Sequence, residues 1–424
     1  MSKIDLSKSL IGSIGVYTIT QIINAFIPFV MIPILTRYLN PEEFGMYSMF
    51  KVTAGLVFSF IGIGINGAIT KLYYEKEKKE LAIYVFNSLF LVTIMSLLLF
   101  ILFEMFSSYT SSISSIPASW LWTVIFASYG KVLFQVTLVI WQMEKKPISF
   151  GAFQLIQTAT NFLLNMIFVV SLSLNWKGAL LAEVSSFFVF GLIGIYILRK
   201  SHWLHIKLDK SDIKHSIKFG IPIIPHVIGM YIITVSDRFL VSNMIGLQET
   251  GIYTVGSQIA MIIMILQESF NKAWVPWLFS NLKKDKLILK KRIVKITYLY
   301  YVVILVGVII LSMISPLVVT WFAGFKYQGA DKYIFWLALG YAFNGMYKMV
   351  TNYIFYVGKT YYLSIVTAIT ALINLGLSYL LILLNGAIGA AQATAISYFI
   401  SFILTFYLSN KVYKMPWALI KNKN

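Results

Sequence analysis

RYLNPEEFGMY, residues 37–47, and NMIGLQETGIY, residues 243–253, are two versions of one motif. A glutamate, a glycine and a tyrosine recur at the same spacing in both. Each version follows one long apolar run and precedes another. A motif that recurs in the same context predicts an internal duplication of the chain.

Two further matches occur in the same order in both halves. They pair Lys146 and Asn161 with Lys359 and Asn374, and Gly178-Ala179 with Gly386-Ala387. Coincidence explains three ordered matches poorly, so we expect two homologous halves. Internal repeats of this kind are typical of membrane transporters.

Composition indicates that the repeats lie in a membrane. Of the 424 residues, 58% are hydrophobic and 12% are charged, which excludes an ordinary soluble protein of this length. The formal net charge is +19. The basic residues cluster between apolar runs rather than along one polar face, so they do not indicate nucleic-acid binding. The absence of cysteine excludes disulfides and thiol catalysis.

Twelve apolar runs are long enough to cross a bilayer, for which about 20 residues are needed. The runs are continuous, whereas a β-barrel would show shorter alternating segments. We therefore predict an all-α membrane protein with twelve transmembrane helices. The predicted spans are 8–36, 42–70, 81–106, 116–141, 148–172, 178–198, 216–243, 250–279, 292–314, 331–357, 361–384 and 387–409.

The distribution of lysine and arginine predicts how the helices are oriented. If the N-terminus is inside, the cytoplasmic connections and tails hold 24 of these residues and the outer connections hold four. This bias follows the positive-inside rule. We therefore expect both termini in the cytoplasm, N-in and C-in.

The duplication divides the predicted spans into two lobes of six helices. We expect an N-terminal lobe at 1–198, a cytoplasmic amphipathic linker at 199–215, and a C-terminal lobe at 216–424 with a short basic tail. Because six is even, the second copy enters the membrane in the same orientation as the first. The lobes should then be related by a pseudo-two-fold axis along the membrane normal.

Five short motifs carry a resemblance to a known family. They are residues 37–47, Phe219-Gly220-Ile221-Pro222, Asp237-Arg238, Gly251-Ile252-Tyr253 and residues 385–390. Taken in order, they resemble the oligosaccharide-lipid flippases of the polysaccharide transporter family, in the multidrug/oligosaccharidyl-lipid/polysaccharide (MOP) exporter superfamily. The resemblance extends over nearly the whole chain and implies the two-lobed, MATE-like fold.

The resemblance also implies a function. Such proteins move undecaprenyl-diphosphate-linked oligosaccharide repeat units, for O-antigen or capsule, from the cytoplasmic to the outer leaflet of the bacterial inner membrane. It implies alternating access through a central cationic cavity, no enzymatic reaction, and membrane lipids, a polysaccharide polymerase and a chain-length regulator as partners. Two rivals stay open: a drug or ion antiporter of the same superfamily, and a membrane polysaccharide polymerase or glycosyltransferase.

Four basic residues within the predicted spans are candidate substrate ligands, because charges in a bilayer are costly and usually functional. Fixed cations would replace the hydration that a diphosphate loses there. Structural ion pairs between helices, or lysine side chains that reach the membrane surface, are the alternatives. The four residues are Lys51, Lys131, Arg238 and Lys348.

Further polar residues complete the predicted substrate site, namely Asn24, Arg37, Gln135, Asn344 and Asn352. Lys131 and Gln135 are one helical turn apart and should share a face. Asn344, Lys348 and Asn352 form a stripe that we expect to face water. Hydrogen bonding between packed helices is the alternative role for these amides.

Three more residues are candidates for ion pairing or ion coupling. Asp237 precedes Arg238, and Glu268 lies one turn before Lys272, which predicts a local pair on one helix. The chain has no Walker sequence, no glycine-rich dinucleotide loop and no metal-ligand spacing of His and Glu. We therefore expect no cofactor, no metal and no catalytic residue.

Overall fold

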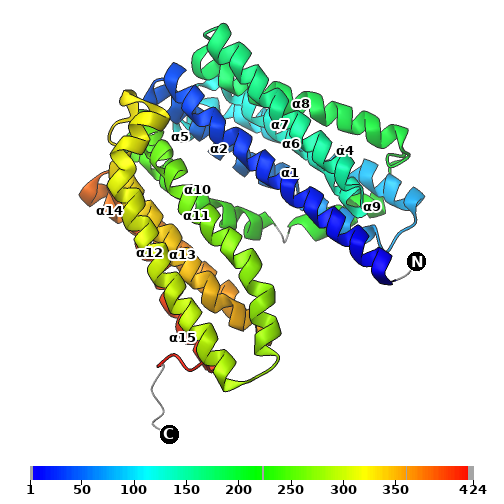
Figure 1. Ribbon diagram of the computed structural model, residues 1–424. Helices are drawn as coiled ribbons and strands as arrows, with labels where there is room; N and C mark the ends of the chain where they lie inside the picture. Colours follow the sequence, from blue (N-terminus) through cyan, green and yellow to red (C-terminus); the bar gives the residue numbers. More distant parts are fainter. Residues whose placement is uncertain (1–2, 222–223, 360, 419–424) are drawn as a thin grey trace. The chain divides into compact units, whose positions relative to one another are not determined.

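The computed structural model describes residues 3–221, 224–359 and 361–418 (Figure 1). Helices dominate these ranges, which contain no β-strand. The chain divides into two compact units, Met1–Val235 and Ser236–Asn424. The all-α class predicted from the sequence is confirmed.

The first unit is built around helix α6 (Leu121–Met143). It packs against α8 (Asn175–Lys200), α2 (Pro41–Ile61) and α4 (Lys78–Met105). The remaining elements are α1 (Lys3–Tyr38), α3 (Ile65–Leu72), α5 (Ser107–Ser114), η1 (Ala118–Trp120), α7 (Pro147–Asn165), the π-helical η2 (Met166–Ser171) and α9 (Lys210–Gly220). Helix α10 (Ile224–Met244) carries the chain into the second unit.

The second unit is built around α13 (Asp331–Val357). This helix packs against α15 (Ile388–Val412), α11 (Leu247–Leu282) and α12 (Leu287–Ala323). Helix α14 (Tyr361–Asn385) packs on α15, and the short η4 (Phe325–Tyr327) follows α12. After α15 the chain turns back, so that Met415 is buried in a cluster with Trp274 and Tyr353.

Ten helices of the described ranges are long and apolar enough to cross a membrane. The chain is thus a multi-pass membrane protein. The two other predicted spans, 216–243 and 331–357, overlap α10 and α13, which are not among the ten. The count of twelve spans and the N-in, C-in orientation therefore stay predictions.

The recurring motif marks the start of a helix in both units. Asn40 caps α2: its side-chain oxygen accepts from the backbone N–H of Glu43 at 2.9 Å, and the Glu43 carboxylate accepts from the backbone N–H of Asn40 at 2.9 Å. Such a capping box satisfies backbone donors that the first turn leaves without partners. In the second copy Gly246 precedes α11, and Glu249 occupies the same third helical position. A carboxylate there also stabilises the positive end of the helix dipole.

The predicted span 42–70 is wrong as one continuous helix. The chain leaves α2 after Ile61 and starts α3 at Ile65, and between them Ile63 and Gly64 have positive φ angles of 37° and 60°. A left-handed backbone is strained for isoleucine and easy for glycine. Hydropathy does not register this break because the residues around it are apolar.

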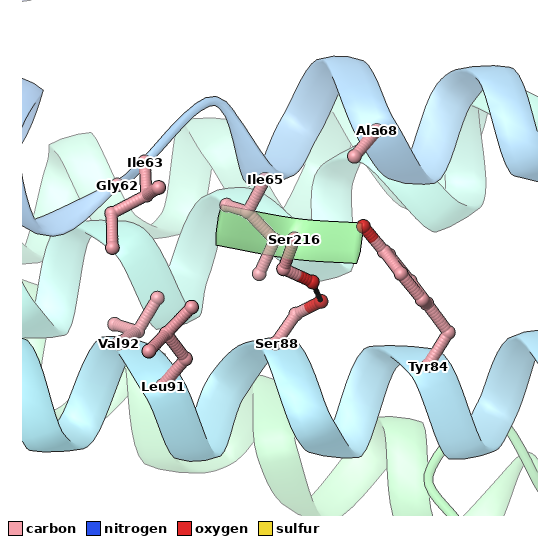
Figure 2. Close-up of a pocket in the computed structure, with 9 residues that line it drawn as sticks. All are labelled: Gly62, Ile63, Ile65, Ala68, Tyr84, Ser88, Leu91, Val92 and Ser216. Atoms are coloured by element: carbon pink, nitrogen blue, oxygen red, sulfur yellow. Dashed lines mark hydrogen bonds between the residues drawn. The ribbon is translucent and has the colours of Figure 1, made fainter. Parts of the chain in front are cut away.

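Helix α9 lies in the region predicted as linker and helix 7, and it packs against α3 and α4. It begins six residues before the predicted start of helix 7 and ends at Gly220, whose missing side chain leaves room for Ile63 at the break. Figure 2 shows the small void, of about 10 Å³, that remains between the break, α4 and α9. The Ser88 and Ser216 hydroxyls are joined there by a 3.1 Å hydrogen bond. The predicted lobe boundaries 1–198, 199–215 and 216–424 stay a prediction.

Glycine lets α6 and α8 approach closely. A side-chain carbon at Gly130 would lie 2.7 Å from backbone atoms of Phe187 and Phe188, and one at Gly191 would lie 2.7 Å from the Gly130 carbonyl oxygen. Small residues at helix crossings are a common means of packing in membranes, where lipid removes the hydrophobic drive for association. This crossing fixes the distance between the two helices that supply part of the site described below.

We expect Gly130→Ala to destabilise the protein, although alanine is the better helix former by about 1 kcal/mol. The added methyl group meets backbone that cannot move aside, and overpacking of this kind costs about 1–3 kcal/mol. Gly376→Ala on α14 is the matched control, since no atom lies within 4 Å of the added carbon. The check is the melting temperature of the purified protein in detergent. A Gly130→Ala melting temperature at or above that of the wild type would contradict the claim that α6 and α8 are too close at Gly130 to admit a side chain.

Candidate functional site

A cavity of about 50 Å³ lies within the first unit. Helix α2 contributes Phe50, Lys51, Ala54 and Gly55, α6 contributes Ala127, Ser128 and Lys131, and α8 contributes Glu183 and Phe187. The two lysines are near the middle of their helices. The cavity therefore places three ionisable side chains far from either end of the spans.

Helical spacing explains why these residues meet. Lys51 and Gly55, Ala127 and Lys131, and Glu183 and Phe187 are each four positions apart, so each pair lies on one helix face. The Ser128 hydroxyl donates to the backbone carbonyl of Ala54 at 2.8 Å and ties α6 to α2. The small residues at 54, 55, 127 and 128 leave the space that the charged side chains border.

The two cavity lysines contact aromatic rings. The ammonium of Lys131 is 5.0 Å from the ring centre of Phe58 and 5.6 Å from that of Phe187, and the ammonium of Lys51 is 5.3 Å from the ring of Tyr47. A ring face attracts a cation but does not neutralise it. Among the described residues, no ion pair includes Lys51, Lys131 or Glu183. Both predicted lysines of this unit thus line one cavity, and neither forms a salt bridge with a described residue.

Glu183 is held by amides of α7. The Asn161 side chain donates to its carboxylate at 3.2 Å, and Asn165 donates to the Asn161 backbone and side-chain oxygens at 2.9 and 3.3 Å. The prediction from sequence did not include Glu183 among the site residues. A signal was present in the sequence, because the amides Gln157, Asn161 and Asn165 recur about one turn apart on α7 and share a face.

Tyr231 of α10 lies against α2 beside Lys51. Its hydroxyl donates to the backbone carbonyls of Lys51 and Val52, at 3.2 and 3.1 Å. Gly55 makes this possible, because any side chain there would overlap the tyrosine ring. Tyr231 is thereby tied to the backbone of the helix that carries Lys51.

The remaining predicted residues of the first unit make other contacts. Gln135 accepts a 2.8 Å hydrogen bond from Asn66 of α3, and Asn24 accepts one from Thr158 of α7. Neither lines the cavity. Arg37 is exposed in the last turn of α1. We expected Lys131 and Gln135 to line the substrate site together. Only Lys131 lines the cavity, because the Gln135 side chain is directed toward Asn66 of α3.

In the second unit, Lys348 of α13 forms an ion pair with Glu268 of α11. The predicted pair between Glu268 and Lys272 is wrong, because the carboxylate is directed across the helix interface rather than along its own helix. The Lys272 side chain is exposed. The pair follows from the extensive packing of α11 on α13.

The polar stripe of α13 also faces α11. Asn344 accepts from Gln267 at 3.1 Å, and the Asn352 amide donates to Asn271 at 3.2 Å. Asn352 is buried, with 5% of its surface exposed, so the prediction that the stripe faces water is wrong for this residue. Amides and an ion pair together join the two helices.

Asp237 and Arg238 do not pair side chain to side chain. The Asp237 carboxylate accepts from the Arg238 backbone N–H at 2.8 Å and from the Tyr253 hydroxyl at 2.7 Å. The Arg238 guanidinium donates to Ser257 at 3.1 Å, while its Nε has no hydrogen-bond partner in the described part of the chain. The Asp237 carboxylate thus accepts two hydrogen bonds, and no ion pair among the described residues includes Arg238.

The fold of this chain is similar to that of solved membrane transporters. A solved MATE-family multidrug resistance transporter of the MOP superfamily, in its inward-facing conformation, is 15% identical, with a TM-score of 0.72 over 95% of this chain and 96% of that one. The lipid II flippase MurJ is 17% identical, with a TM-score of 0.72 over 92% of this chain and 87% of that one. An uncharacterized membrane protein of Haemophilus influenzae is 26% identical over 374 residues, covering 87% of this chain and 89% of the relative.

These matches define the class of protein: a multi-pass membrane protein with the fold of MOP-superfamily transporters. Residues 10–282, which include the whole charged cavity, match the family described as polysaccharide biosynthesis protein. The chain belongs to that family. The resemblance and the fold predicted from the sequence motifs are confirmed.

We expect Lys348→Met to lower the melting temperature in detergent more than the double substitution Lys348→Met with Glu268→Gln. The single change leaves a carboxylate without its partner, whereas the double change removes both charges. Single and double variants form a cycle that isolates the pair. If the decrease in melting temperature of the double variant equals the sum of the decreases of the two single variants, the two side chains do not stabilise one another.

Proposed function

We propose that this protein is a flippase that moves undecaprenyl-diphosphate-linked oligosaccharides from the cytoplasmic to the outer leaflet of the bacterial inner membrane. Membership in the polysaccharide biosynthesis family and the transporter fold support this class of function. The observation that carries the choice of substrate is the cavity of the first unit, which Lys51 and Lys131 line and where no ion pair of the described residues includes either lysine.

The charges of the substrate and the cavity are complementary. A diphosphate gives up its hydration shell when it enters a membrane interior, and the cost of an unpaired ion there is large. Two ammonium groups supply donors and positive charge in place of water. We propose that the diphosphate binds between Lys51 and Lys131, while the prenyl chain stays in lipid and access alternates from one side of the membrane to the other.

The rival antiporter reading fits the cavity less well. A site for cationic drugs requires excess negative charge, whereas two lysines and one glutamate line this cavity. The enzyme reading has less support, because the matched folds are those of transporters. A polysaccharide polymerase and its chain-length regulator would then act on the translocated product as partners.

We expect the double variant Lys51→Ala, Lys131→Ala to accumulate lipid-linked oligosaccharide on the cytoplasmic face, with export of the polymer reduced at least tenfold. Loss of two charge-assisted contacts, each worth about 1.5–3 kcal/mol, is sufficient for an effect of that size. The measurement is the amount of lipid-linked intermediate in cells whose own copy is replaced by the variant, normalised to the abundance of the protein in the membrane.

The matched control is Lys207→Ala with Lys326→Ala, which removes two lysines outside the spans and should leave export unchanged. Normal export by the cavity variant would remove the two lysines from the mechanism. If deletion of the whole protein causes no accumulation, the flippase function itself is wrong and the antiporter reading gains support.

A further inference from the structure

Glu183 is the carboxylate that lines the cavity together with Lys51 and Lys131. Anion binding alone does not explain why a carboxylate lies in this cavity, because a negative charge next to the diphosphate would weaken its binding. With both lysines charged and the glutamate ionised, the three side chains carry a net charge of +1. With the glutamate protonated, the net charge is +2.

Few other ionisable groups face Glu183. Helix α2 presents Tyr47 and Lys51, α6 presents Lys131, and Tyr231 of α10 lies near Lys51. Helix α7 and η2, which pack against α8, contain no ionisable residue and present the neutral amide of Asn161. Among the described residues, the basic groups that border the cavity with Glu183 are thus Lys51 and Lys131.

An anion that binds to both lysines would neutralise their positive charge. The lysines would then no longer offset a negative charge on Glu183. Glu183 would then be a carboxylate beside a diphosphate, and like charges at short range repel. A protonated carboxyl has the opposite effect. It removes the repulsion and adds an O–H donor, which an ionised carboxylate lacks.

We propose that Glu183 takes up a proton from water when a diphosphate binds between Lys51 and Lys131, and returns it when the diphosphate leaves. This inference rests on the proposed function, because it requires an anionic ligand in this cavity. The substrate and a proton then occupy the site together. By linkage, a ligand that increases proton binding is itself bound more tightly by the protonated protein.

Proton uptake on binding is directly measurable. Farnesyl diphosphate, a short-chain prenyl diphosphate, is titrated into the full-length protein in lipid nanodiscs by calorimetry, in two buffers of different ionisation enthalpy. We expect the wild-type protein to take up about one proton more per bound ligand than Glu183→Gln does, since one group changes its protonation state. Uptake by the diphosphate itself is common to both proteins and cancels in the comparison.

Two further variants sharpen the test. Glu183→Asp keeps a carboxylate and should retain the uptake, whereas Glu104→Gln removes an exposed carboxylate of α4 and should leave it unchanged. The infrared difference spectrum of the wild-type protein should gain a protonated carboxyl band when farnesyl diphosphate is added. This spectrum tests the inference even where Glu183→Gln does not fold.

The outcomes separate the two proposals. Equal uptake by the wild type and Glu183→Gln, or a wild-type spectrum without the carboxyl band, overturns the role of Glu183 while binding between the lysines stands. Binding that is unchanged in Lys51→Ala, Lys131→Ala, or absent in the wild type, overturns the cavity as the diphosphate site and the inference with it.

Discussion

In the hydrocarbon layer of a membrane, every polar group must find its partner inside the protein. Backbone groups meet this constraint by forming helices, and the described ranges are helical almost throughout. Charged side chains meet it in different ways in the two units. In the second unit, Glu268 pairs with Lys348, Asp237 accepts from Tyr253, and Arg238 donates to Ser257. In the first unit, Asn161 donates to Glu183, and no ion pair among the described residues includes the cavity lysines Lys51 and Lys131.

This contrast distinguishes charged residues that join helices to one another from charged residues that could bind a ligand. The pair between α11 and α13 is accompanied by amide hydrogen bonds on either side, which is the pattern of a helix interface. The cavity lysines have aromatic rings and small residues around them instead. An uncompensated cation in the middle of a span is costly. A ligand of opposite charge would offset this cost, which is why we propose that the diphosphate binds in the first unit.

Much of the fold could be predicted from the sequence, because apolar length and cap residues act locally. The motif at residues 37–47 starts a helix as its Asn40 and Glu43 predict, and every predicted span overlaps a helix. The break at Ile63 could not be predicted, since it depends on packing against α4 and α9. The partner of Glu268 and the cavity role of Glu183 depend on how helices are rotated toward one another. Hydropathy carries no information on that rotation, so the sequence pointed to both cavity lysines but missed the acid beside them.

The cavity also relates the transporter fold to the polysaccharide biosynthesis family. A fold that hosts different cargoes must differ in the side chains that contact the cargo, and we propose that the two lysines of this cavity select an anion. The most direct test is a structure of the protein in nanodiscs with farnesyl diphosphate bound. We expect density for the two phosphates in contact with the ammonium groups of Lys51 and Lys131, next to Glu183. Phosphate density at Lys348 or Arg238, with the cavity of the first unit empty, would contradict it.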